Sequence, residues 1–244
     1  MKPLEQLGRA AGWVLAAPPF AALSAARRAR PLHPHGILLT GECDAMAPPD
    51  DLLTLGDALS GPVLARLSSA IWKAPGTHRP DVLGCAIRID GEQDLLFATI
   101  KRPWTTPFAP LTTDVDDFLA NFYYGVSPFR CEGVRRRFWM RLRPIRTEVQ
   151  DGARDDRESR LLLALGHADV GFGVDVSYRP RIGWREVARI TLERLAESTP
   201  RGEENLRFDP FFDGRGIRPT GMIHALRHGA YAASRAARSL VRAA

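Results

Sequence analysis

Residues 30 to 41 read Arg-Pro-Leu-His-Pro-His-Gly-Ile-Leu-Leu-Thr-Gly, and they join a loop with two histidines to a short apolar segment. Ile37 to Thr40 is rich in β-formers and bounded by glycines, so we expect a strand there. His33 and His35 stand two positions apart, which beside a strand can place both imidazoles on one face, as a zinc or iron site requires. Two surface histidines are the plainer interpretation, and the spacing alone leaves both open.

The composition favours a single large domain with a substantial core, because 45% of the 244 residues are hydrophobic. The formal charge is +6, and lysine occurs only at Lys2, Lys73 and Lys101, so nearly all the cation is arginine. Guanidinium groups recognise carboxylates and phosphates through paired donors, which makes an anionic ligand plausible. Most arginines are scattered rather than interleaved with aromatics on one face, so we expect no nucleic-acid partner.

The cysteines favour a reducing, cytoplasmic location. Cys43, Cys85 and Cys131 have no CxxC spacing and are odd in number, so they predict neither a disulfide framework nor a zinc ribbon. Residues 12 to 23 are apolar but too short to span a membrane, and Pro18-Pro19 interrupts them. We interpret them as a packing segment, with peripheral membrane contact as an open alternative.

The apolar pattern divides the chain into three parts. The apolar pattern of residues 1 to 29 predicts a helical arm that packs on the domain or on a partner. A homo-oligomer is therefore one of the possible assemblies. Residues 30 to 222 form the predicted barrel domain, and 223 to 244 a basic, alanine-rich C-terminal helix. A helix is expected over 114 to 125. Strands are expected at 37–42, 63–68, 84–89, 95–99, 138–143, 160–166, 172–178 and 185–194, which predicts an antiparallel barrel or sandwich.

Four separated segments share their order and spacing with one known family. They are Arg30-x-x-His33-x-x-Gly36, Val63-x-x-Arg66-Leu-Ser68, Arg79 to Ile89 with Gln93-Asp94-Leu95 after it, and Arg207-x-x-x-Phe211-x-Asp213-x-x-x-x-Arg218. Together they resemble the heme catalases and the smaller catalase-related peroxidases, over about residues 28 to 125 and 200 to 235. The resemblance implies an α+β fold, in which helices pack outside an antiparallel β-barrel.

By this resemblance heme is the expected cofactor. The arginines corresponding to Arg30, Arg66 and Arg218 pair with the heme propionates in that family, since a guanidinium holds a carboxylate by two hydrogen bonds. Arg207 and Phe211 would belong to the proximal heme segment. Alternatively, these arginines form ordinary salt bridges, or their side chains pack over the ends of the barrel.

The resemblance also assigns distal residues. His33 would lie over the heme and transfer protons during O–O cleavage of a peroxide or hydroperoxide, and Ser68 would orient its imidazole. Thr99 stands near the place of the catalase distal asparagine and has a shorter reach. Phe211 replaces the proximal tyrosine and has no atom able to bind iron.

Three functions follow from these residues. The leading hypothesis is a divergent heme-dependent oxidoreductase with peroxidase-type chemistry through His33. Phe211 also supports a catalytically silent, heme-free barrel that binds an apolar anion, such as a fatty acid, or a protein partner. A metal-dependent hydrolase using His33 and His35 ranks last, because no Asp or Glu stands at a ligand spacing with them and the other histidines are scattered, so we expect no dedicated metal site.

Overall fold

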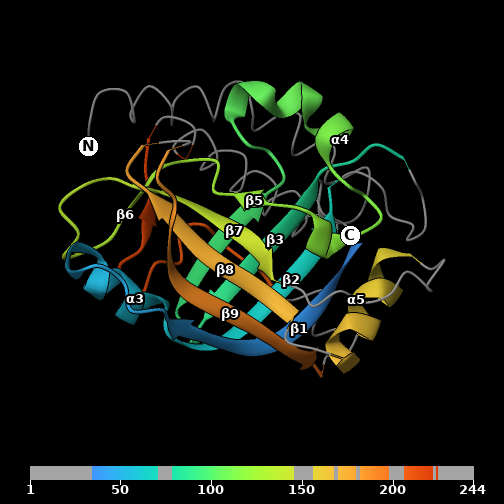
Figure 1. Ribbon diagram of the computed structural model, residues 1–244, viewed down its shortest axis with the longest axis horizontal. Helices are drawn as coiled ribbons and strands as arrows, with labels where there is room; N and C mark the ends of the chain where they lie inside the picture. The colour runs from blue at the N-terminus through green and yellow to red at the C-terminus, as the bar shows by residue number, and fades with distance from the viewer. Residues whose placement is uncertain are drawn as a thin grey trace, which may run out of the picture.

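The computed structural model describes residues 35–70, 79–145, 156–167, 170–179, 182–197, 206–221 and 224. The predicted arm, Arg30 and His33 lie outside these residues, as does nearly all of the predicted C-terminal helix. The described part is built around one closed β-barrel with helices outside it (Figure 1). This confirms the predicted α+β fold with an antiparallel barrel.

Eight antiparallel strands close the barrel, and each pairs with its neighbours in the order given. They are β1 (His35–Ala45), β2 (Gly61–Ser69), β3 (Leu83–Ile89), β4 (Gln93–Ala98), β5 (Tyr123–Tyr124), β7 (Trp139–Ile145), β8 (Val170–Ser177) and β9 (Arg185–Leu195). A separate two-stranded sheet joins β6 (Phe129–Arg130) to β10 (Arg218–Pro219). This small sheet ties a segment after the barrel back to the connection between β5 and β7.

The barrel interior is filled by the alternate apolar residues of each strand. On β2 the side chains of Val63, Ala65 and Leu67 are buried in the core. Leu67 pairs directly with Cys85 of β3, which pairs with Phe97 of β4, so these three side chains share the inner face. The apolar residues at alternate positions of the strand expected at 63–68 are therefore the ones that face the core.

Gly41, at the end of the histidine-bearing segment, allows β1 to meet β9. The register between the two strands shifts between Thr40 and Gly41. A Cβ at Gly41 would lie 2.0 Å from the Thr191 carbonyl oxygen, so only glycine fits this close approach.

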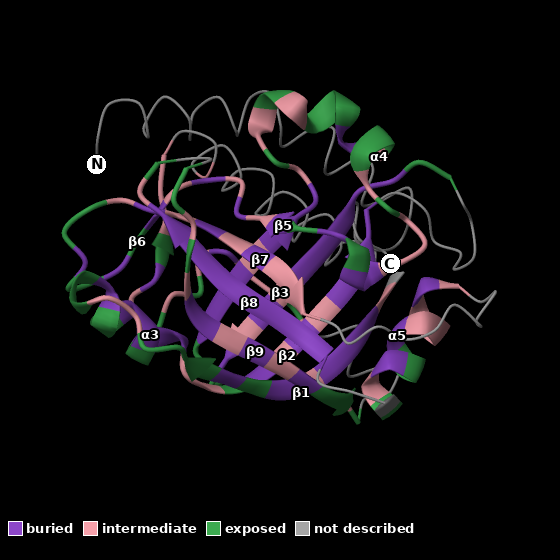
Figure 2. Ribbon diagram, in the orientation of Figure 1, coloured by how far each residue is buried: buried purple, intermediate pink, exposed green. Residues whose placement is uncertain are grey.

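Short helices cover the outside of the barrel. They are η2 (Asp50–Leu52), α3 (Leu53–Leu59), η3 (Pro103–Phe108), α4 (Ala109–Thr112), η4 (Phe118–Ala120) and α5 (Arg157–His167). Helix α4 is largely exposed, whereas strand β8 is buried along its whole length and β9 alternates between buried and more accessible residues (Figure 2). Within the described residues, no helix combines the length and the apolar content needed to cross a lipid bilayer.

The strand expected at 160 to 166 is wrong, because these residues belong to α5. The segment is rich in leucine and alanine, which are strong helix formers, and it lacks β-branched residues. The Asp156 carboxylate accepts hydrogen bonds from the backbone N–H groups of Glu158 and Ser159, so it caps the helix. A short apolar run of this kind does not separate a helix from a strand by periodicity alone.

The helix expected over 114 to 125 is also wrong. Side chains there take over the backbone hydrogen bonds that a helix would need. Asn121 accepts from the Asp114 N–H and donates to the carbonyls of Asp114 and Asp117. The result is the single turn η4, after which Tyr123 enters the barrel core as part of β5.

Candidate functional site

The outer face of strands β1 to β4 carries a row of small residues. Gly36 pairs with Ser68, Ser68 with Gly84, and Gly84 with Ala98, so their side chains share one face. Because the adjacent Leu67 faces the core, this row faces outward. Ser68 and Ala98 are nevertheless buried, so other groups cover this part of the outer face.

Arg66 belongs to the next row of the same outer face. A Cβ built on Gly36 would lie 3.0 Å from the Arg66 Cζ atom and 2.7 Å from the Ser68 Cβ atom. The guanidinium therefore folds back over Gly36, beside the serine. The structure thus brings together two of the residues that the sequence assigned to the site, Arg66 and Ser68.

The hydroxyl groups of Ser68 and Thr99 have different neighbours. The Ser68 hydroxyl is 3.4 Å from the Gly84 carbonyl oxygen, which is a long hydrogen bond. The Thr99 hydroxyl accepts from the Leu83 N–H at 3.1 Å and lies 2.8 Å from the Thr113 hydroxyl. Thr99 therefore links β3 to the end of α4, and it is Ala98 that shares the outer row with Ser68.

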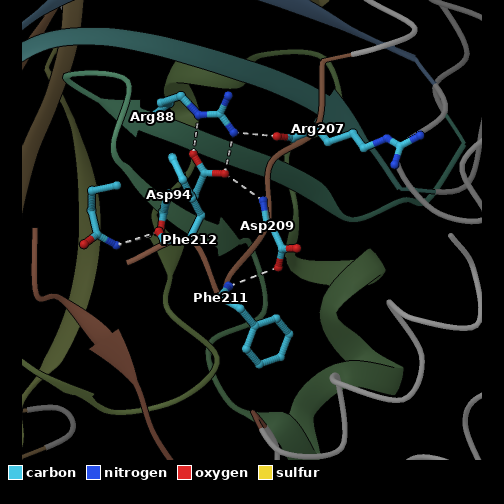
Figure 3. A network of polar contacts seen from close by, with 7 residues as sticks. Arg88, Asp94, Arg207, Asp209, Phe211 and Phe212 are labelled. Carbon is cyan, nitrogen blue, oxygen red and sulfur yellow. Dashed lines mark hydrogen bonds and ion pairs between the residues drawn. The ribbon is translucent and has the colours of Figure 1, made fainter. Parts of the chain in front are cut away.

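Residues 206 to 217, which include the expected proximal segment except for Arg218, are held at the hairpin between β3 and β4 (Figure 3). Arg88 and Asp94 form a double ion pair there, with both donor–acceptor distances at 2.7 Å. Arg88 Nη2 also donates to the Arg207 carbonyl, and the Asp209 N–H donates to Asp94 Oδ2 at 2.7 Å. The pair is thus shared between the hairpin and the later segment.

Gln93 holds the same segment through its side-chain amide. Its Oε1 accepts from the Ile217 N–H at 3.1 Å, and its Nε2 donates to the Ile217 carbonyl at 3.0 Å. Nε2 lies 3.3 Å from the Phe212 carbonyl as well. Gln93 is fully buried, so these bonds form out of water and fix the position of the segment.

Sequence reasoning assigned no role to Arg88 or Gln93. A usable signal existed for Arg88, because it and Asp94 each stand three residues from Gly91, in the short connection between the strands expected at 84–89 and 95–99. Antiparallel pairing places such residues opposite each other on one face. No comparable signal existed for Gln93, whose partners Phe212 and Ile217 lie more than a hundred residues away in sequence.

Arg207, Phe211 and Arg218 lie on the segment that meets the β3–β4 hairpin at Arg88, Gln93 and Asp94. Arg207 is exposed and contributes its carbonyl, and Arg218 is 67% exposed and pairs with Asp213 at 2.6 Å. The Phe211 ring packs at 4.6 Å, between ring centroids, from the His224 ring. The segment meets β4 at Gln93 and Asp94, roughly 13 Å along the strand from Ala98 at about 3.3 Å per residue.

Other groups of catalytic type are few among the described residues. His35 is the first residue of β1. The described part of the chain contains no group of three or more His, Cys, Asp or Glu side chains that could hold a metal ion. Burial raises the pKa of the Cys43 thiol to about 12 and also raises that of Cys85, so neither supplies a thiolate at neutral pH.

Comparison with known proteins finds similarity in structure but not in sequence. No family model matches the chain, and no curated protein matches it. A fungal catalase superposes with a TM-score of 0.62 and 14% identity, covering 89% of this chain and 61% of the catalase. Catalase A from Saccharomyces cerevisiae gives 0.60 and 13%, covering 89% and 63%. The chain spans less than two thirds of these catalases, and the described barrel has the catalase-like fold.

Proposed function

We propose that the protein is a divergent catalase-related heme protein, with the heme lying against the outer face of strands β1 to β4. One observation carries this proposal: Arg66 and Ser68 stand on that face beside a row of small residues. Heme is a broad, flat, largely apolar ring with two carboxylates at one edge. A flat floor with a guanidinium beside it is the surface that such a group requires.

The described residues fit the distal half of such a site. Gly36, Gly84 and Ala98 would form the floor, and a side chain at Gly36 would collide with Arg66 and Ser68. Arg66 would hold a propionate, together with Arg30 of the preceding loop. The contacts proposed for this half of the site do not involve Phe211, which has no atom that could bind iron. They do not involve Arg207 or Arg218 either, because these residues belong to the segment at the other end of the hairpin.

The heme would supply oxidation and reduction chemistry on a peroxide or an organic hydroperoxide. His33 precedes Gly36 by three residues, and Gly36 pairs with Ser68, so His33 is expected at this end of the sheet. Its imidazole would take a proton from one peroxide oxygen and return it to the leaving oxygen. The Ser68 hydroxyl would hold the orientation of that imidazole.

Hemin titration of the purified protein, followed by Soret absorbance and the pyridine hemochrome assay, tests the proposal. We expect one heme per chain, and Arg66→Gln should bind hemin about tenfold more weakly because a charge-assisted bond is lost. Arg194→Gln removes an exposed guanidinium from β9 and should leave the affinity unchanged. His33→Ala should keep the heme and lose peroxide consumption. A folded wild-type protein that rejects hemin would overturn the proposal.

A heme-free barrel that binds another apolar anion or a protein partner is the second candidate. Phe211, packed against His224 as an ordinary aromatic residue, supports it. Mass spectrometry of heme-free protein would then find a fatty acid or similar lipid at one per chain. That result, combined with no response to hemin, would favour this candidate over the heme protein.

A further inference from the structure

A second candidate site lies where β8 leads into β9. A cavity of about 200 Å³ opens there, and its walls come from the loop before β7, from η2 and from the connection between β8 and β9. Three arginines line it, Arg136, Arg179 and Arg185, together with Tyr178 and Ser177. The cavity contains none of the residues proposed to hold heme.

The three guanidinium groups make no ion pair with any described residue, and all three are exposed. Arg136 instead lies over the Tyr178 ring, with its Cζ 4.9 Å from the ring centroid. Elsewhere in the barrel, arginines such as Arg88 and Arg141 have carboxylate partners. The cavity therefore gathers cations that form no ion pair with a carboxylate of the described residues.

Asp51 meets this site through Tyr178, and its carboxylate is already engaged. The Tyr178 hydroxyl donates a short hydrogen bond to Asp51. Burial and this bond raise the pKa of Tyr178 to about 12, while Arg136 and Arg185 oppose the rise. The charges of these two arginines therefore act at the Tyr178 hydroxyl. With three guanidiniums and the Asp51 carboxylate, the described groups at the site carry a net charge of +2.

The backbone that carries Arg179 is held in place. The Ser177 hydroxyl lies 2.5 Å from the Arg179 carbonyl and 2.7 Å from the Ile182 carbonyl, and it accepts from the Arg179 N–H. Ser177 is only 2% exposed, so these bonds are shielded from water. Leu52 and Val176 add a buried apolar wall, which lowers the local dielectric and strengthens attraction between the guanidiniums and an anion.

We propose that this cavity binds a phosphate group, either as inorganic phosphate or as the phosphate of a small organic ester. Phosphate carries close to two negative charges at neutral pH, which matches the net charge of the site. Guanidinium groups bind its oxygens through paired donors. The volume is below that of typical ligand pockets, so it admits the phosphate with only a short organic part. This site is independent of the proposed heme function.

Isothermal titration calorimetry with inorganic phosphate and with glycerol 3-phosphate, at low ionic strength, tests the site. Arg136→Gln and Arg185→Gln should each weaken binding about tenfold, and the double variant should abolish measurable heat. Arg194→Gln removes the same charge from the far end of β9 and should leave binding unchanged. Tighter binding of glycerol 3-phosphate would identify an ester as the ligand, and equal affinities would identify free phosphate.

A substitution at Asp51 should change the affinity for phosphate in the opposite direction. Asp51→Asn removes the carboxylate that is bound to Tyr178 and should tighten phosphate binding several-fold, since it raises the local net charge. Circular dichroism spectra and melting curves would show that each variant is folded. No heat with either ligand, or equal weakening in Arg194→Gln and Arg136→Gln, would overturn the proposal, because general attraction to a basic protein would then explain any binding.

Discussion

Arg88 and Asp94 face each other across the hairpin of β3 and β4, and their two hydrogen bonds, Nε to Oδ1 and Nη2 to Oδ2, are both 2.7 Å long. The Asp94 side chain is completely buried, while that of Arg88 is 22% exposed. The pair also binds the backbone of residues 207 and 209, so one ion pair holds two distant parts of the chain together.

Removing Arg88 should therefore be strongly destabilising. Arg88→Ala leaves a buried carboxylate without its cation, which typically costs about 3 to 5 kcal/mol of unfolding free energy. Urea denaturation followed by circular dichroism would measure the loss. Asp213→Asn breaks the exposed pair with Arg218 and should cost less than about 1 kcal/mol. Similar losses in the two variants would contradict the role given to Arg88.

Gln93 should control the attachment of residues 206 to 217 to the barrel. Gln93→Ala deprives the N–H and the carbonyl of Ile217 of their partners, both in a buried setting. Each lost bond of this kind costs about 1 to 3 kcal/mol. Hydrogen exchange should quicken at the Ile217 and Gly214 amides and stay slow in β8. Uniform quickening across the barrel would instead mean global destabilisation.

Gly36 should tolerate no side chain. A Cβ there would lie 2.4 Å from the Leu67 carbonyl oxygen, so Gly36→Ala should destabilise by about 1 to 3 kcal/mol and displace Arg66. Gly166 of α5 has open space around its Cβ position, and Gly166→Ala should stabilise by about 0.5 to 1 kcal/mol. Thermal melting would compare them, and opposite signs are the expected result.

Tyr178 should ionise near pH 12, because burial and the bond to Asp51 raise its pKa to about that value. An unfolded tyrosine ionises near pH 10, so the folded form is favoured below pH 10, and this contribution to stability is lost as the pH rises from about 10 to 12. Ultraviolet titration of tyrosinate in the wild type, Tyr178→Phe and Asp51→Asn would test it. Asp51→Asn should lower the pKa of Tyr178, and an unchanged curve would contradict the assignment.

The cysteines should be unreactive in the folded protein. Cys43, Cys85 and Cys131 are free and buried, and burial raises the pKa of each thiol. A thiol reagent at pH 8 should therefore label none of them in buffer and all of them in denaturant. Fast labelling of the folded protein would show that the barrel opens readily.

Much of the barrel could be predicted from local sequence. The alternation at Val63 to Ser68 and the glycine-bounded segment before Gly41 are local patterns, because a strand with one buried face repeats every two residues. The same reasoning failed at 160 to 166, where an apolar run suits either a helix or a strand. It failed again at 114 to 125, where Asn121 and Asp117 take backbone bonds that the helix needed.

The candidate site was predicted only in part. The pairing of Arg66 and Ser68 on one face follows from their spacing of two along a strand, so the sequence by itself determined it. Tertiary structure alone decided that Arg218 turns to Asp213, that Gln93 binds Ile217, and that three arginines gather around Tyr178. The alternation of side chains along a strand depends only on neighbouring residues. These contacts instead join residues far apart in the sequence, and they depend on the register between strands and on how the barrel closes, which no local pattern encodes.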